Sequence, residues 1–201
     1  MIRNIVFDLG NVLISFRPAA YLEKNNYPAA LGQTILSDIF RSQEWLLLDN
    51  GELTPGEAID RIAEKSSLRR EEIALIFNKR TDIMFSLDYN VKLLPELRKA
   101  GFRLYYLSNF PADIFDEVKR SYPLFEYFDG GIISADVRFS KPAPAIFNVF
   151  LKKYDLCADE CFYIDDIEEN VIVAESIGMT GFFTSGSTDI SEELLKRLNH
   201  C

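Results

Sequence analysis

Five short runs of apolar, β-branched and aromatic residues constrain the fold of this chain more than any other feature of its sequence. They lie at residues 2–8, 103–108, 130–135, 160–165 and 180–184. Each has the length and composition of a buried strand. The last four alternate with amphipathic segments of helical spacing at 91–100, 112–121, 143–154, 167–177 and 190–199. Because strands that alternate with helices form right-handed βαβ units, we predict a doubly wound α/β fold with a parallel sheet.

The first two predicted strands are separated by about ninety residues, far more than one crossover needs. Four segments of this stretch have helical character, at 18–24, 31–41, 54–65 and 69–83. The third begins with a capping-box pattern at Thr54 and Glu57. We therefore predict that residues 16–87 form an inserted helical cap domain, and that residues 1–15 and 88–201 form the α/β core domain.

Trp45 and the leucines at 46–48 fall between two of the helices predicted in the cap. Burial statistics for large apolar side chains favour packing inside the helical bundle. A lid face over the functional site is the alternative.

Composition excludes several classes of partner. The net charge is −9, and the basic residues occur as short pairs, so we expect no binding to nucleic acid or to an anionic membrane surface. No apolar run is long enough to span a membrane, and the N-terminus enters a strand-like run without a signal-peptide pattern. We expect a cytoplasmic protein.

The residue inventory also excludes histidine and cysteine chemistry. His200 is the only histidine and is the penultimate residue, where fraying is expected, so catalytic triads and histidine metal sites lack their central part. Cys157 and Cys161 are not followed by the phosphate-binding loop that a cysteine phosphatase needs. Carboxylates remain as the candidate reactive groups.

Polar residues stand where the predicted strands end. They are Asp8 after the first run, Ser108 and Asn109 after the second, Lys141 beside Pro142 where the helix after the third run would begin, and Asp165 and Asp166 after the fourth. Taken singly, each could cap a turn or a helix. In an open parallel sheet, however, ligands bind at the carboxyl ends of the strands, so this order of polar residues favours one functional site.

The order of these motifs resembles the haloacid dehalogenase-like hydrolases, in the branch with a helical (C1-type) cap inserted after the first strand. FDLGNVL at 7–13 looks like the first motif, LSN at 107–109 the second, Lys141-Pro142 the third and FYIDDIEEN at 162–170 the fourth. The FDLGNV form is similar to that of α-D-glucose-1-phosphate phosphatases and of the phosphatase domain of epoxide hydrolases. The resemblance covers nearly the whole chain and implies a Rossmann-like sheet with strand order 5-4-1-2-3.

The resemblance implies a nucleophile and a metal site. Asp8 would attack phosphorus and form an aspartyl-phosphate, a mixed anhydride that is itself easily hydrolysed. Mg²⁺ would be held by Asp8, the backbone carbonyl of Gly10 and Asp166, with Asp165 adjacent.

The resemblance also implies how the substrate is bound. Lys141 and Ser108 would act as catalytic residues and, with Asp8 and the Asn109 backbone, would bind the transferring phosphate. The implied function is a Mg²⁺-dependent phosphatase for a small phosphorylated metabolite, with a sugar phosphate such as a hexose 1-phosphate as the leading substrate. We expect a monomer or a weak dimer.

One position departs from the family pattern. Most phosphatases of the family carry an aspartate two residues after the nucleophile, which protonates the leaving oxygen and later activates water; this chain has Gly10. General acid–base catalysis contributes about 10²–10⁴-fold to the rate. Either the substrate has a good leaving group, as an anomeric or acyl phosphate does, or water or a cap residue supplies the proton. The first cap residues to test are Glu44, Asp49 and Glu52.

Other functions on the same scaffold remain as alternatives. A catalytically weakened family member that acts as a phospho-ligand-binding or regulatory protein would also explain Gly10. A dehalogenase needs no metal, so the acidic pair at 165–166 would only add repulsion. A mutase normally depends on the missing acid.

Overall fold

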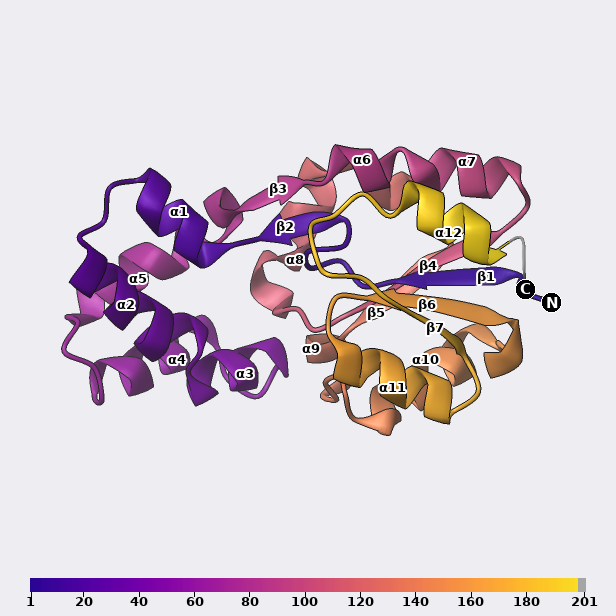
Figure 1. The fold of residues 1–201 in the computed structure, drawn as a ribbon. Coiled ribbons are helices and arrows are strands. Elements are labelled where there is room, and N and C mark those ends of the chain that lie inside the picture. The colour runs from indigo at the N-terminus through magenta and orange to yellow at the C-terminus, as the bar shows by residue number, and fades with distance from the viewer. Residues whose placement is uncertain (199–201) are drawn as a thin grey trace.

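A five-stranded parallel sheet forms the centre of the computed structural model, which describes residues 1–198 (Figure 1). Its strands lie in the order β5-β4-β1-β6-β7, and every neighbouring pair is parallel. They are β1 (Asn4–Phe7), β4 (Arg103–Ser108), β5 (Gly130–Ile133), β6 (Cys161–Asp165) and β7 (Thr180–Phe183). The predicted α/β class is confirmed. Counted along the chain, the strands lie in the order 3-2-1-4-5, which is 5-4-1-2-3 read from the opposite edge.

Helices cover both faces of the sheet, because each strand turns alternate side chains to opposite faces. On β1, Ile5 and Phe7 join one hydrophobic cluster, whereas Val6 joins another. The first cluster includes side chains of α7 (Leu93–Lys99), α8 (Ala112–Ser121) and α12 (Ser191–Leu198), and the second includes side chains of α10 (Pro144–Tyr154) and α11 (Glu168–Ser176). Figure 1 shows α7 and α12 on one side of the sheet and α10 and α11 on the other.

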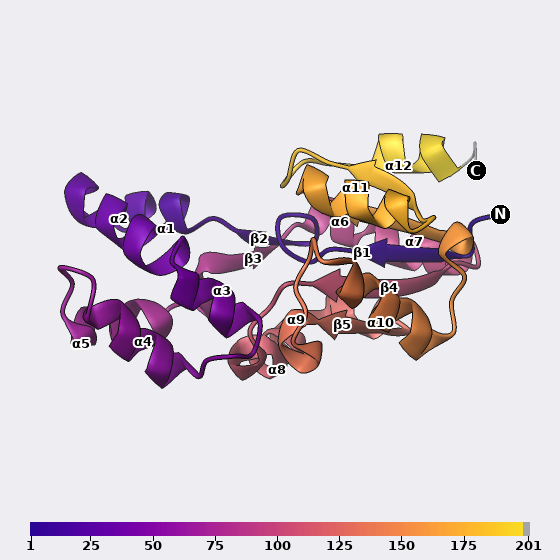
Figure 2. The same ribbon diagram turned by 90° about the horizontal axis from the view of Figure 1, so that it is seen from below.

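Between β1 and β4 the chain leaves the sheet and forms a helical part. β2 (Ile14–Phe16) leads out and pairs antiparallel with β3 (Met84–Ser86), which leads back. The helices between them are α1 (Pro18–Lys24), α2 (Ala29–Ile35), the π-helical turn η1 (Leu36–Phe40), α3 (Gln43–Asp49), α4 (Pro55–Ala63), α5 (Arg70–Phe77) and the 3₁₀ turn η2 (Thr81–Ile83). α1 to α5 and η1 share a hydrophobic cluster of their own around Ile39, Ile62 and Ile73, and Figure 2 shows these helices set to one side of the sheet. The cap boundaries at 16 and 87 stay a prediction.

The segment around Trp45 is a helix, α3, which the sequence prediction lacked. Ser42 is its N-cap, because the Ser42 hydroxyl accepts a hydrogen bond from the Trp45 backbone N–H at 3.0 Å. The segment 31–41 is likewise divided between α2 and η1, and the segment 69–83 between α5 and η2.

The chain after β5 also differs from the prediction. A short helix, α9 (Ser134–Val137), follows β5 directly and ends at Arg138, whose φ of 57° is left-handed. The next helix, α10, begins at Pro144, so Lys141 and Pro142 lie in the loop before it and not at a helix start. The strands β2 and β3 were not predicted, because three residues are too few to show a period.

The remaining short elements are α6 (Asp88–Val91) and the 3₁₀ turns η3 (Pro123–Tyr127) and η4 (Ala158–Glu160). Of the helices within residues 1–198, none combines the length and apolarity needed to cross a membrane. His200 and the end of the predicted helix 190–199 lie outside the described residues.

Candidate active site

The carboxyl ends of β1, β4 and β6 meet beside the loop before α10 and line a cavity of about 180 Å³. Its polar lining side chains are those of Asp8, Asn11, Asp49, Ser108, Asn109, Lys141, Asp166 and Asn170, and Gly10 lines it as well. The structure therefore brings the residues singled out by the sequence to one place. Asp165 is the exception, since it lies fully buried behind the wall.

Lys141 forms ion pairs with two carboxylates, those of Asp8 and Asp165. Its Nζ lies 2.8 Å from Asp8 Oδ1 and 2.7 Å from Asp165 Oδ2. Asn109 holds the backbone of Lys141, because the Asn109 side chain accepts from the Lys141 N–H at 2.9 Å and donates to its carbonyl at 3.0 Å. Burial alone would lower the pKa of Lys141, but the carboxylates of Asp8 and Asp165 raise it above its ordinary value. The ammonium stays charged beside the nucleophile candidate.

Both carboxylate oxygens of Asp165 accept hydrogen bonds from protein donors. The Ile167 N–H donates to Oδ1 at 2.8 Å, and the Asn170 amide lies 3.0 Å from Oδ2. The Tyr163 hydroxyl donates to Oδ2 as well. These bonds favour a role for Asp165 in orienting Lys141 over direct metal binding.

Sequence reasoning missed Tyr163, which contributes to this arrangement. Tyr163 and Asp165 are two positions apart on β6, so they share a face of the strand, and this spacing was a signal that could have been used. The Lys141 ammonium also lies 5.8 Å from the centre of the Tyr163 ring.

Asp8, Asp165 and Asp166 form an acidic group whose nearest oxygens all lie within 4.8 Å of one another. Burial raises the pKa of Asp8 to about 7; Lys141 opposes this shift, and Asp165 adds to it. Burial and the neighbouring Asp165 also raise the pKa of Asp166. Because three crowded carboxylates and one ammonium leave excess negative charge, the site fits a hard divalent cation such as Mg²⁺, and Asp8 and Asp166 are the carboxylates that would hold it.

Gly10 and Asn11 form the turn after Asp8. A Cβ built on Gly10 would meet only Asp8 Oδ2, at 3.6 Å, which is an ordinary contact, so the backbone does not require glycine at this position. Asn11 has a φ of 53° and its side chain accepts from the Phe16 N–H at 3.0 Å. A hydrogen bond from Asn11 also lowers the pKa of Asp166, so Asn11 holds Asp166 in place.

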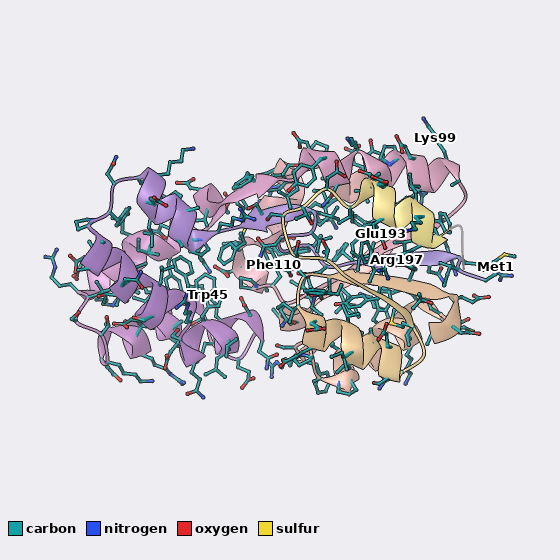
Figure 3. The ribbon with its side chains drawn as sticks, in the orientation of Figure 1. Met1, Trp45, Lys99, Phe110, Glu193 and Arg197 are labelled. Carbon is teal, nitrogen blue, oxygen red and sulfur yellow. The ribbon has the colours of Figure 1, made fainter. Side chains whose placement is uncertain are left out.

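The rest of the cavity lining is mainly apolar. It consists of Ile14, Phe16, Trp45, Met84, Phe110, Pro111, Ile114 and Ile167, together with Asp49. Figure 3 labels Trp45 in the helical part and Phe110 next to the sheet. Trp45 fills both roles weighed from the sequence, because it packs on Phe40 and Phe77 in the helical cluster and also lines the cavity.

Comparison with known proteins places this geometry in a family. A model of the haloacid dehalogenase-like hydrolases matches residues 2–178. The sesquiterpene phosphatase astK of Aspergillus oryzae is 28% identical over 189 residues, which cover 94% of this chain and 93% of that protein. The D-ribitol-5-phosphate phosphatase of Bacteroides thetaiotaomicron is 25% identical over 209 residues, which cover 99% of this chain and 100% of that protein.

A solved structure agrees with these matches. A haloacid dehalogenase-like family enzyme from Bacteroides thetaiotaomicron, in complex with magnesium and inorganic phosphate, has a TM-score of 0.74 and is 26% identical, covering 96% of this chain and 99% of that chain. The family model ends just before β7, so it includes every strand that carries a polar residue of the site. The chain therefore belongs to the haloacid dehalogenase-like hydrolases.

Proposed function

We propose that this hydrolase is a Mg²⁺-dependent phosphatase that acts on a small phosphorylated metabolite through an aspartyl-phosphate on Asp8. The observation that carries the proposal is the buried Lys141 ammonium, which contacts Asp8 in the cavity and the buried Asp165 behind its wall, beside Asp166. The magnesium and phosphate complex of the Bacteroides family enzyme supports the same chemistry.

Each residue of the site has a distinct task in this proposal. Asp8 is the nucleophile, and Lys141 lowers the pKa of Asp8 against the effect of burial and offsets the charge of the incoming phosphate. Ser108 and the Asn109 backbone donate hydrogen bonds to the transferring oxygens. Asp8, the Gly10 carbonyl and Asp166 hold Mg²⁺, which when bound neutralises and orients the phosphate.

The cavity limits the organic part of the substrate. Its volume of about 180 Å³ lies below the ~300–1,000 Å³ that is usual for drug-sized ligands, which favours a small metabolite in this arrangement of the helical part. A sugar 1-phosphate remains the leading candidate from the sequence. The apolar wall supports a second candidate, a phosphate ester of a small apolar alcohol, because Asp49 is the only residue of that wall with a charged side chain.

The nucleophile assignment is tested by Asp8→Asn. We expect this variant to lose turnover of every phosphate ester, while its circular dichroism spectrum stays that of the parent protein. A panel with Mg²⁺ would compare glucose 1-phosphate, ribitol 5-phosphate and dimethylallyl phosphate by release of inorganic phosphate. Turnover retained by Asp8→Asn would show that the nucleophile is a different residue.

The alternative of a weakened family member has its own signature. It predicts that the parent protein binds inorganic phosphate in a Mg²⁺-dependent way in calorimetry but hydrolyses no member of the panel. Turnover of any member above the Asp8→Asn background contradicts that alternative.

A further inference from the structure

Asp49, the last residue of α3, is the one acidic side chain that the described part of the helical segment 16–87 contributes to the cavity wall. Its neighbours in the wall include Phe16 and Trp45, so Asp49 lines the cavity within an apolar surface. The nucleophile candidate Asp8 lines the same cavity from the sheet. Asp49 is therefore placed to reach a substrate that is bound at Asp8.

The Asp49 side chain is not neutralised as a structural carboxylate would be. Its Oδ1 is buried and has no hydrogen-bond partner, while the side chain accepts one hydrogen bond from Trp45. Buried polar groups are nearly always paired, so an unpaired oxygen in a cavity wall points to a ligand or to a bound proton.

Two charged groups, Arg80 and Asp113, act on Asp49 with opposite signs, and the effect of Arg80 is the larger. Arg80, between α5 and η2, donates to Asp113 of α8 at 3.2 Å and to the Phe77 carbonyl at 2.7 Å. Burial raises the pKa of Asp49 to about 7, Arg80 lowers it in part, and Asp113 raises it further. A carboxyl with this pKa can both give up and take back a proton near neutral pH.

The end of α3 is fixed against the core, which holds the Asp49 carboxyl in place. The Ser134 hydroxyl donates to the Asp49 carbonyl, and the Ser140 hydroxyl donates to Asn50 Oδ1 at 2.5 Å. Gly51 has a φ of +70°, and a Cβ there would lie 2.6 Å from the Ala135 carbonyl oxygen. Only glycine permits this close approach of the α3 end to α9.

The structure separates Asp49 from the other two acids that the sequence singled out. Glu44 is buried but forms an ion pair with Lys65, which lowers its pKa, and it does not line the cavity. Glu52 is exposed and accepts a hydrogen bond from Asn50.

We propose that Asp49 is the general acid and base of this hydrolase and performs the proton transfers that Gly10 cannot. The proposal rests on the phosphatase function proposed above. Asp8 attacks phosphorus, the bond from phosphorus to the leaving oxygen breaks with its electron pair on that oxygen, and the oxygen takes the proton of the Asp49 carboxyl and departs as an alcohol. The Asp49 carboxylate then takes a proton from water, whose oxygen attacks the aspartyl-phosphate; the bond from phosphorus to Asp8 breaks, and inorganic phosphate and the Asp8 carboxylate are restored.

The test compares two esters that differ in their need for a proton. n-Propyl phosphate has a poor leaving group that requires protonation, whereas the phenolate of 4-nitrophenyl phosphate leaves readily without it. The variant is Asp49→Asn, which keeps the shape and the acceptor for Trp45 but has no acidic proton. We expect its kcat/KM for n-propyl phosphate to fall about 10²–10⁴-fold, with a loss at least tenfold smaller for the aryl ester.

The matched control is Glu44→Gln. It removes one carboxylate charge from the same helix at a buried position outside the cavity, and we expect both esters to keep kcat/KM within about threefold. A merely structural role of Asp49 would reduce both esters by the same factor.

The outcomes separate the two proposals. If Asp49→Asn hydrolyses n-propyl phosphate as well as the parent protein does, or loses both esters equally, the role of Asp49 is refuted while the phosphatase function stands. If the parent protein with Mg²⁺ turns over neither ester above the Asp8→Asn background, the phosphatase function fails and this inference fails with it.

Discussion

Replacing Lys141 by methionine tests the electrostatic balance of the site without depending on any substrate. The substitution keeps most of the aliphatic stem and removes the ammonium, so Asp8 and the fully buried Asp165 lose their shared cation. Removing one partner of a buried ion pair costs about 3–5 kcal/mol, because the remaining charge is uncompensated. Asp166 adds to the repulsion, since its oxygens belong to the same acidic group.

The assay is thermal unfolding in buffer without divalent cations. For a chain of this size each kcal/mol lowers the midpoint by about 2–4 °C, so Lys141→Met should unfold about 6–20 °C below the parent protein. Lys79→Met is the control, because Lys79 pairs with Asp82 at 2.9 Å on the surface, where both side chains are about half exposed. An exposed pair of this kind contributes about 0–1 kcal/mol. If the two variants lose the same stability, Lys141 does not neutralise the acidic group.

Four further expectations follow from the same geometry. Because the folded state raises the pKa of Asp49 from 3.8 to about 7, the stability of the parent protein relative to Asp49→Asn should fall as pH rises across that interval, measured by urea unfolding. Gly51→Ala should lower the unfolding midpoint and the turnover of n-propyl phosphate together, because its Cβ meets the Ala135 carbonyl. Gly10→Asp should restore part of the n-propyl phosphate turnover in the Asp49→Asn background, since a Cβ fits at this position. If turnover does not rise, an acid at position 10 does not replace the proton donor that Asp49→Asn removes. EDTA should abolish phosphate release, and added Mg²⁺ should restore it.

The core of the fold and the acidic side of the site could be predicted from the sequence because they follow from local patterns. Apolar runs of five or so residues alternating with helical segments specify a parallel sheet, and the carboxyl ends of its strands converge at one edge. Asp8 and Asp166 meet for that reason, as Figure 1 makes plain from the adjacent positions of β1 and β6. The roles of these residues remain predictions until the variants are measured.

The opposite wall of the cavity could not be predicted, because it depends on contacts between elements that leave weak patterns. The α9 helix has four residues, and the α3 segment with Trp45 and Leu46 to Leu48 is too apolar to show a clear helical face. The sequence named three acids on or near α3, but it does not show that Glu44 pairs with Lys65, that Glu52 is exposed, or that Asp49 lines the cavity. Tyr163 was missed because a tyrosine inside a buried strand looks like core.

A proton donor on α3 in place of one beside the nucleophile makes catalysis depend on how the helical part sits against the sheet. With an aspartate at position 10, the acid would accompany Asp8 in every arrangement of the two parts. With Asp49 as the acid, protonation of the leaving oxygen requires the contacts of α3 with α9 and the loop before α10. A substrate too large for the cavity of about 180 Å³ would hold α3 away from α9. Such a substrate would still bind at Asp8, but its alcohol would depart slowly because Asp49 could not protonate the leaving oxygen. Increasing the size of the organic group should therefore lower kcat more than it raises KM. We expect this effect for alkyl esters and not for aryl esters of equal bulk. A series of alkyl and nitrophenyl phosphates of increasing size would measure this difference, and equal losses of kcat in the two series would refute it.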